Sequence, residues 1–243
     1  MTLEQVVKSA ATVAAVGVIF LGGMFISSPR AHADDSSGAT PESEEVEIGL
    51  KIAPVKLNMT GKDRKLVGLG SFIVNGQADC NGCHTSDPTM EYKDPGNPFF
   101  NQHPTIVNPD TYLAGGNNFG PVGGGIVNGV PGPGPDIITR NLTPDHTGLP
   151  EGGHSFGDFL IIMRTGKDFD HLHPNCSGAP TPTTNCYFST PGNEIDGNLL
   201  QIMPWPTFSN MTDHQLLAIW TYLSAIPCNA NKNSPYPGVR NVC

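Results

Sequence analysis

The segment Asp79–Thr85, "DCNGCHT", places two thiols and an imidazole within the five residues from Cys80 to His84. Three chemistries use such a cluster. A Cys-x-x-Cys pair can cycle between dithiol and disulfide, it can supply half of a zinc site, and with a histidine directly after it, it can attach haem c. The rest of the sequence decides among them.

The chain begins with the order of features that is typical of a secretory signal. Lys8 precedes an apolar run at residues 10–26, and the small-residue sequence "AHA" comes directly before Asp34. We therefore expect residues 1–33 to be removed and the protein to be periplasmic or extracellular. The apolar run is also close to the length that spans a bilayer, so a retained segment would instead act as a membrane anchor.

The composition is that of an acidic, loop-rich protein with a net charge of −9, 29 glycines, 23 prolines and 37% hydrophobic residues. The negative charge argues against a nucleic-acid partner, whose phosphates need lysine and arginine. It permits steering toward a basic protein partner, although net charge also serves solubility alone. A covalent cofactor or disulfides would help a chain with so modest a core to stay folded.

The chain after the signal segment divides by composition. Residues 34–59 open with "DDSSGATPESEEVE" and predict a flexible acidic leader. Helical patterns then mark a domain at residues 60–227, with loop insertions at about 87–136 and 171–201, and a tail follows at 228–243. The first insertion contains "LAGGNNFGPVGGGIVNGVPGPGP", whose apolar residues are too scattered to predict a strand ladder.

Three amphipathic helices are predicted in this domain, so we expect an all-α fold of a few short helices set among long loops. The first begins at Thr60 and runs almost directly into Cys80. The second is capped by Ser155 and the last by Thr212. The other boundary signals are the capping partners Asp63, Asp158 and Gln215 and the stop signals Gly166 and Pro227.

The flanking sequence favours haem over the two thiol chemistries. A structural zinc site needs a second Cys/His pair at short spacing, and no second Cys-x-x-Cys occurs. A thioredoxin-type site lies in a βαβ pattern, whereas here a helix precedes the motif and a loop follows it. We therefore predict one covalent haem c, held by thioethers of Cys80 and Cys83, with His84 as a ligand of its iron.

Beyond these patterns, the chain resembles class I c-type cytochromes. The resemblance rests on "CNGCH" after an amphipathic helix and on "IMPWPTFSNMTDHQLLAIWTYLSAIP" at residues 202–227, and it covers about residues 62–227. The segments "YLAGG", "RNLTPD" and "FLIIMRTGKD" further resemble exported bacterial cytochromes related to the cytochrome subunits of quinoprotein alcohol dehydrogenases. Those subunits carry several CxxCH motifs and this chain carries one, so their partner is not carried over.

The resemblance implies roles for further residues. In the family the N-terminal and C-terminal helices cross with a small residue against an aromatic one, and Gly70 and Trp220 or Tyr222 match those positions. Glycine physically permits such a close approach of two backbones. The segment with Asn141 and Thr143 lies near the haem in such proteins, so these side chains are expected to hydrogen-bond a propionate. The alternative is a turn capped by the Thr-Pro-Asp sequence.

A sixth ligand of the iron is expected among the methionines. Met163 and Met211 lie on or beside predicted apolar stripes, where methionine is more often core filler. Met90 follows His84 too closely to reach the opposite face of the haem easily. Met203 precedes two prolines that flank a tryptophan and stiffen the loop, and it matches the ligand position of the family. We therefore predict His84 and Met203 as the axial ligands.

The four cysteines outside the motif predict two disulfides, because they form an even number in an exported protein. Of the three pairings, Cys176–Cys186 with Cys228–Cys243 closes the shortest loops. These pairs would hold the second insertion and the tail.

The predicted function is electron transfer between redox partner proteins, without enzymatic activity; the sequence names neither donor nor acceptor. One alternative is a haem enzyme or ligand sensor whose sixth position opens, for which His154 or His103 could be nominated as an acid–base residue. Another is a structural haem subunit of a larger redox complex, whose long loops form the interface.

Overall fold

The computed structural model describes residues 40–121, 124–127, 130–133, 136–169 and 199–243. The chain divides into two units, Met1–Gly38 and Ala39–Cys243, and every described residue belongs to the second. The predicted signal segment, most of the second insertion and the predicted Cys176–Cys186 pair lie outside the described residues.

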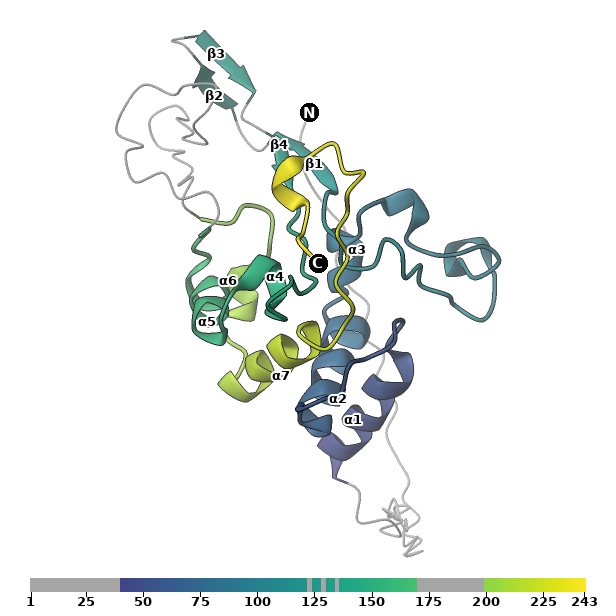
Figure 1. The fold of residues 1–243 in the computed structure, drawn as a ribbon. Coiled ribbons are helices and arrows are strands. Elements are labelled where there is room, and N and C mark those ends of the chain that lie inside the picture. Colours follow the sequence, from purple (N-terminus) through teal and green to yellow (C-terminus); the bar gives the residue numbers. More distant parts are fainter. Residues whose placement is uncertain (1–39, 122–123, 128–129, 134–135, 170–198) are drawn as a thin grey trace, which may run out of the picture. The chain divides into compact units, whose positions relative to one another are not determined.

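The described chain is mostly helical, as predicted, and its helices are short (Figure 1). The π-helix η1 continues α2 directly, and short 3-10 turns occur in the loops. The helices are α1 Pro41–Ile52, α2 Arg64–Phe72, η1 Ile73–Gln77, α3 Cys80–His84, α4 Pro150–Gly153, α5 Phe156–Thr165, α6 Trp205–Phe208 and α7 Asp213–Leu223, and the 3-10 turns are η2 Pro88–Met90, η3 Pro98–Phe100 and η4 Pro237–Val239. In the part of the chain that is described, no helix is long and apolar enough to cross a membrane.

The prediction of a flexible leader at residues 34–59 is wrong for α1. This helix has Thr40 as its N-cap and a proline in its first turn, and it buries Val46 and Gly49. Those two residues face α2, where the Ser71 hydroxyl donates a hydrogen bond to the Gly49 carbonyl at 2.6 Å. A Cβ on Gly68 would come 2.7 Å from a Val46 methyl group, so the two helices are in close contact. The acidic composition of this segment gave no sign of the face that α1 buries against α2.

The first helix of the predicted domain begins at Arg64, four residues after the expected start at Thr60. Its N-cap is Asp63, whose carboxylate accepts hydrogen bonds from the backbone of Lys65 and Leu66. Asp63 therefore caps the helix itself instead of partnering Thr60. The starts of the other two helices are confirmed: α5 and α7 begin with complete capping boxes at Ser155 and Thr212. Helix α5 ends at Thr165 with the left-handed Gly166 as its C-cap, as predicted, whereas α7 ends at Leu223, four residues before the predicted stop at Pro227.

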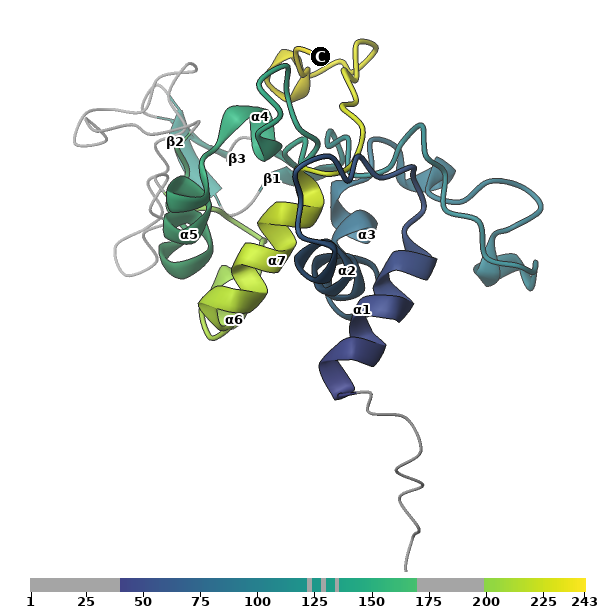
Figure 2. The same ribbon diagram turned by 60° about the horizontal axis from the view of Figure 1, so that its bottom comes forward.

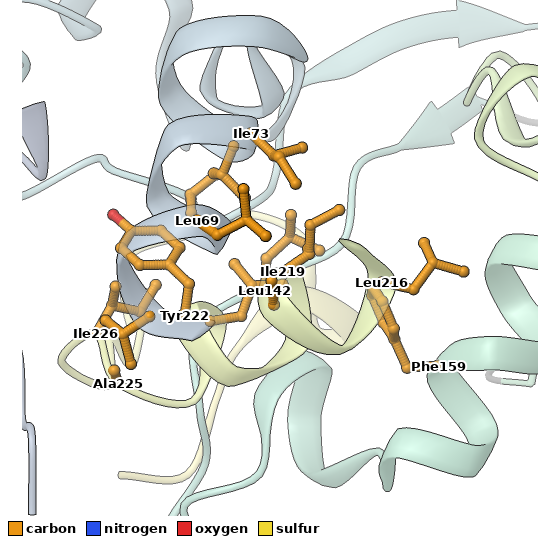
Figure 3. Packing of buried hydrophobic residues seen from close by; sticks show 14 of the residues in the cluster. Leu69, Ile73, Leu142, Phe159, Leu216, Ile219, Tyr222, Ala225 and Ile226 are labelled. Carbon is orange, nitrogen blue, oxygen red and sulfur yellow. The ribbon is translucent and has the colours of Figure 1, made fainter. Parts of the chain in front are cut away.

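Helices α2 and α7 cross through the centre of the hydrophobic core. Figure 3 shows Leu69 and Ile73 on one side and Ile219 and Tyr222 on the other, with Leu142 from a loop beside them. A Cβ on Gly70 would overlap the Ala218 carbonyl and come 2.7 Å from the Tyr222 Cβ, so Tyr222, rather than Trp220, is the aromatic residue at the crossing. Trp220 instead packs edge-on against Phe156.

The first insertion contains strands, against our expectation from its scattered apolar residues. Strands β1 Asn118–Pro121 and β4 Asp136–Ile138 pair antiparallel, and β2 Gly124–Val127 pairs antiparallel with β3 Val130–Pro133. Two-stranded ribbons are held by backbone hydrogen bonds and need no alternating apolar face. Apolar periodicity is therefore a poor guide to such ribbons.

The tail is tied back onto the domain. The predicted disulfide Cys228–Cys243 is confirmed, with a Cα–Cα distance of 5.6 Å. The Asn241 amide donates to the carbonyls of Thr143 and Pro144 at 3.1 and 3.0 Å. Val239 is buried as well. The tail thus packs against the chain segment that precedes α4.

Candidate cofactor-binding site

A cavity of about 400 Å³ opens beside the CxxCH helix α3. Its volume lies in the range of small-molecule and cofactor sites. Cys80, Cys83 and His84 line one part of it, and side chains from α5, α7, the loop before α6 and the tail line the rest. The predicted attachment motif therefore faces a cavity of cofactor size.

The backbone around α3 fixes the direction of the motif. Asp79, which precedes the helix, is in the left-handed conformation with φ 46°, and this turns the chain sharply out of η1. The buried Asn81 side chain accepts a hydrogen bond from the Leu113 backbone at 2.9 Å. As a result Cys80 is partly buried at the cavity wall, whereas Cys83 is exposed.

Both thiols of the motif are held in the neutral form. Burial, and then the charge of Asp79, raises the pKa of Cys80 to about 12. Burial, followed by Asp79 and Glu91, raises the pKa of Cys83. Thiol oxidoreductases and reactive cysteines lower the thiol pKa instead, because the thiolate is the reactive species. The electrostatics of this pair therefore do not suit dithiol–disulfide exchange.

The His84 ring is oriented by the backbone. Its Nδ1 lies 2.9 Å from the carbonyl oxygen of Arg140 and donates to it, so Nε2 carries the free lone pair. Burial lowers the pKa of His84, and this effect exceeds the opposing influence of the carbonyl bond. A neutral imidazole with one nitrogen hydrogen-bonded to a carbonyl is the usual state of a metal-ligating histidine.

The cavity wall is largely apolar. It includes Leu142, Phe159 and Ile219 from the core, and three methionines, Met163, Met203 and Met211, also line it. Met90 lies in η2, is half exposed and does not line the cavity. The cavity thus brings the predicted ligand Met203 to the same hollow as His84, together with two other thioethers.

The loop that carries Met203 is tightly folded. Ile202 has φ 68°, the Met203 N–H donates to the Gln201 carbonyl at 2.7 Å, and the Trp205 N–H donates to the Met203 carbonyl at 2.8 Å. The Trp205 ring closes on Gly166, where any Cβ would overlap it. These contacts fix the backbone on both sides of Met203.

One edge of the cavity is polar. The Arg140 guanidinium donates to both carboxylate oxygens of Asp168, at 2.6 and 2.7 Å, and the pair is mostly buried. Lys167 and His154 also line this edge. Sequence analysis missed Arg140 and Asp168, although both lie in segments that carry the family resemblance. Their pairing joins chain regions that are far apart in sequence, and only the fold brings them together.

Asn141 and Thr143 do not line the cavity. The Asn141 side chain accepts from the Thr143 N–H at 3.0 Å and donates to the Asn229 carbonyl at 2.8 Å. Both side chains are buried against the tail. These hydrogen bonds join the segment to itself and to the tail.

Comparison with known proteins adds no family to this geometry. No family model matches the chain, and no curated protein or solved structure matches it either. Within the described residues, no group of three or more His, Cys, Asp and Glu side chains is arranged to hold a metal ion.

Proposed function

We propose that this chain is an exported mono-haem c-type cytochrome that carries electrons between redox proteins. The observation that carries the proposal is one apolar cavity lined at once by Cys80, Cys83, His84 and Met203. Two thiols for covalent attachment, an imidazole and a thioether are the donor set of a c-type cytochrome with Met/His ligation.

The donor set fits this cofactor better than the two thiol chemistries. The neutral thiols are unlike those of a thiol oxidoreductase. A structural zinc ion would need two further Cys or His ligands, and no such cluster lies among the described residues. Phe159 and the other apolar residues of the wall match the largely hydrocarbon faces of a porphyrin.

The roles of the residues follow from their surroundings. Haem c would supply a one-electron couple between ferric and ferrous iron. Cys80 and Cys83 would hold it covalently, so that it is not lost outside the cell. His84 would offer Nε2 to the iron while the Arg140 carbonyl keeps the ring from rotating. Met203 would complete the ligation from its rigid loop, and the apolar wall would exclude water.

A haem enzyme or ligand sensor is the second candidate, and His154 is the observation that favours it. This histidine lines the cavity, whereas His103 is exposed on a loop that does not reach it. Three methionines line the same cavity, however, and a thioether is a common ligand of haem iron. Electron transfer with two protein ligands therefore remains the proposal.

Covalent attachment is tested first. The full chain is expressed with export and haem-attachment machinery, purified and extracted with acidified acetone. We expect haem to stay on the polypeptide, and intact-mass spectrometry to find one haem added. Cys80→Ser with Cys83→Ser should abolish attachment, whereas Cys228→Ser with Cys243→Ser should not. Freely extractable haem, or stoichiometric zinc in its place, would contradict the proposal.

A further inference from the structure

Residues 87–110 form a long loop, here called the arm, that leaves α3 and returns to the core near Tyr112. In Figures 1 and 2 it extends away from the helices and carries its own short turns. Apart from Val107, no hydrophobic residue of the arm packs against the hydrophobic core, and no residue of the arm lines the cofactor cavity. The arm therefore serves neither the core nor the cofactor directly.

The arm is nevertheless well ordered by its own hydrogen bonds. Tyr92 and Val107 form an antiparallel bridge, the Lys93 N–H donates to the Ile106 carbonyl at 2.8 Å, and the Ile106 N–H donates to Gly96 at 2.9 Å. Its base is fixed beside α3, where the Ser86 N–H donates to the Thr111 carbonyl at 3.0 Å and the Asn81 side chain lies 3.4 Å from the Glu91 carboxylate. Such a framework holds the tip in place.

The tip of this framework exposes two large aromatic side chains. The turn η3, capped by Asn97, presents Phe99 at 81% exposure and Phe100 at 75%. The Tyr92 ring meets Phe99 edge-on with centroids 6.0 Å apart, which limits how Phe99 moves. Paired, preordered and exposed aromatic side chains are typical of the anchors of protein interfaces.

The charge of the arm identifies the kind of partner. Its acidic residues outnumber its basic ones, and its lysine, Lys93, is already paired with Asp110 at 3.3 Å. The acidic residues of the arm are Asp87, Glu91, Asp94 and Asp110. Cys83, the exposed member of the attachment motif, lies on the helix at the base of the arm. A partner seated on the arm would thus meet negative charge around an apolar contact, on a loop whose base adjoins the site of the proposed haem.

We propose that the arm is a docking element for a small redox protein that has an apolar patch bordered by lysine and arginine, with Phe99 and Phe100 as its anchors. This inference rests on the proposed function, because electron transfer is the reason for docking beside α3. Opposite charges would steer the encounter, and the two aromatic side chains would slow dissociation.

Binding to a defined probe tests the inference. The probe is a small basic cytochrome c whose exposed haem edge is bordered by lysines, and its matched control is the same protein with acetylated lysines. Calorimetric titration of the full exported protein at low ionic strength should find the acetylated probe at least about tenfold weaker, and added salt should shrink that difference.

Variants then separate the anchors from the charge. Phe99→Ser with Phe100→Ser should raise the Kd for the basic probe about tenfold or more, whereas Ile161→Ser, at an exposed apolar residue of α5, should leave it unchanged. Asp94→Asn should weaken binding at low salt, and Glu44→Gln on α1 should not. Native binding by the phenylalanine variant, or equal binding of the acetylated probe, would overturn the inference.

Two controls on the same preparations keep the proposals apart. Haem content and the rate of reduction by ascorbate, a small molecule that needs no docking surface, should be the same in all these variants. Absence of haem would contradict the proposed function, while the Kd values would still decide whether the arm binds a basic protein.

Discussion

Gly70 of α2 lies directly against Ala218 of α7, so that a Cβ on Gly70 would overlap the Ala218 carbonyl oxygen. The same Cβ would come 2.7 Å from the Cβ of Tyr222. Both neighbours are backbone or the first atom of a side chain, and neither can rotate away. The crossing of these two helices therefore depends on the absence of a side chain at residue 70.

Gly70→Ala should accordingly lower the free energy of unfolding, by roughly 1–3 kcal/mol from overpacking. Urea unfolding followed by circular dichroism measures the loss. Gly157→Ala on α5 is the matched control, because its nearest neighbour, the Ser155 hydroxyl, would lie 3.6 Å from the new Cβ. Alanine there should be neutral or slightly stabilising. Equal stability of the two variants would mean that α2 and α7 are not in backbone contact.

Local signals were the most reliable part of the sequence analysis. The capping boxes at Ser155 and Thr212 and the left-handed Gly166 involve residues within four positions of each other, and the structure has all three. The CxxCH motif is likewise contiguous, and it faces a cavity. Short-range chemistry is set by neighbours in the chain, so the sequence predicts much of it, although the start of the first predicted helix at Thr60 was wrong.

Tertiary relationships were missed for the complementary reason. Helix α1 is stabilised by the burial of Val46 against α2, which its acidic composition does not reveal. The hairpins of the first insertion are backbone ladders, which leave no apolar pattern. The carbonyl of Arg140 reaches His84 across 56 positions, and its guanidinium reaches Asp168. Contacts of this kind depend on the path of the loops between the two residues, which local sequence patterns do not specify.

The Cys228–Cys243 disulfide should stabilise the folded chain measurably. It closes a loop with a sequence separation of 15, for which the chain-entropy model gives about 3 kcal/mol. Cys228→Ser with Cys243→Ser should therefore lower the midpoint of urea unfolding, and mild reduction of the native protein should lower it at least as much. An unchanged midpoint in both cases would show that the hydrogen bonds of the tail suffice to hold it.

The buried tyrosine pair should make the fold sensitive to alkali. The hydroxyls of Tyr112 and Tyr222 are 2.8 Å apart, and Asn75 contacts both. Burial raises the pKa of each above its ordinary value of 10, so the folded state keeps protons that the unfolded chain releases. The resulting stability is complete below pH 10 and is lost as pH rises above it.

Tyr222→Phe tests this arrangement. Loss of a buried hydrogen bond should cost about 1 kcal/mol near neutral pH. The variant should also lose stability less steeply above pH 10, because one of the two groups that cause the loss is gone. Urea unfolding at a series of pH values measures both effects. An alkaline slope as steep as that of the native protein would mean that the pair does not couple protonation to folding.

If the chain carries the proposed haem, substitution of the three methionines of the cavity decides which of them is the sixth ligand of the iron. Met203→Ala should open the coordination position, lower the reduction potential and allow carbon monoxide to bind the reduced protein, while haem stays attached. A thioether favours ferrous iron, which is why its loss lowers the potential. Met163→Leu and Met211→Leu should leave the spectrum and the potential nearly unchanged, because leucine fills a similar volume in the apolar wall.

Native protein should bind carbon monoxide poorly, since Met203 would hold the position in both oxidation states. Ready binding of carbon monoxide by the native protein would favour the haem enzyme or ligand sensor, with His154, which lines the cavity, as its acid–base residue. If Met163→Leu or Met211→Leu opens the iron and Met203→Ala does not, the ligand is the methionine so identified. Met163 lies within α5, whereas Met203 lies in a folded loop whose Trp205 ring packs against Gly166, the C-cap of α5. This fixed position is why we expect Met203 to be the ligand.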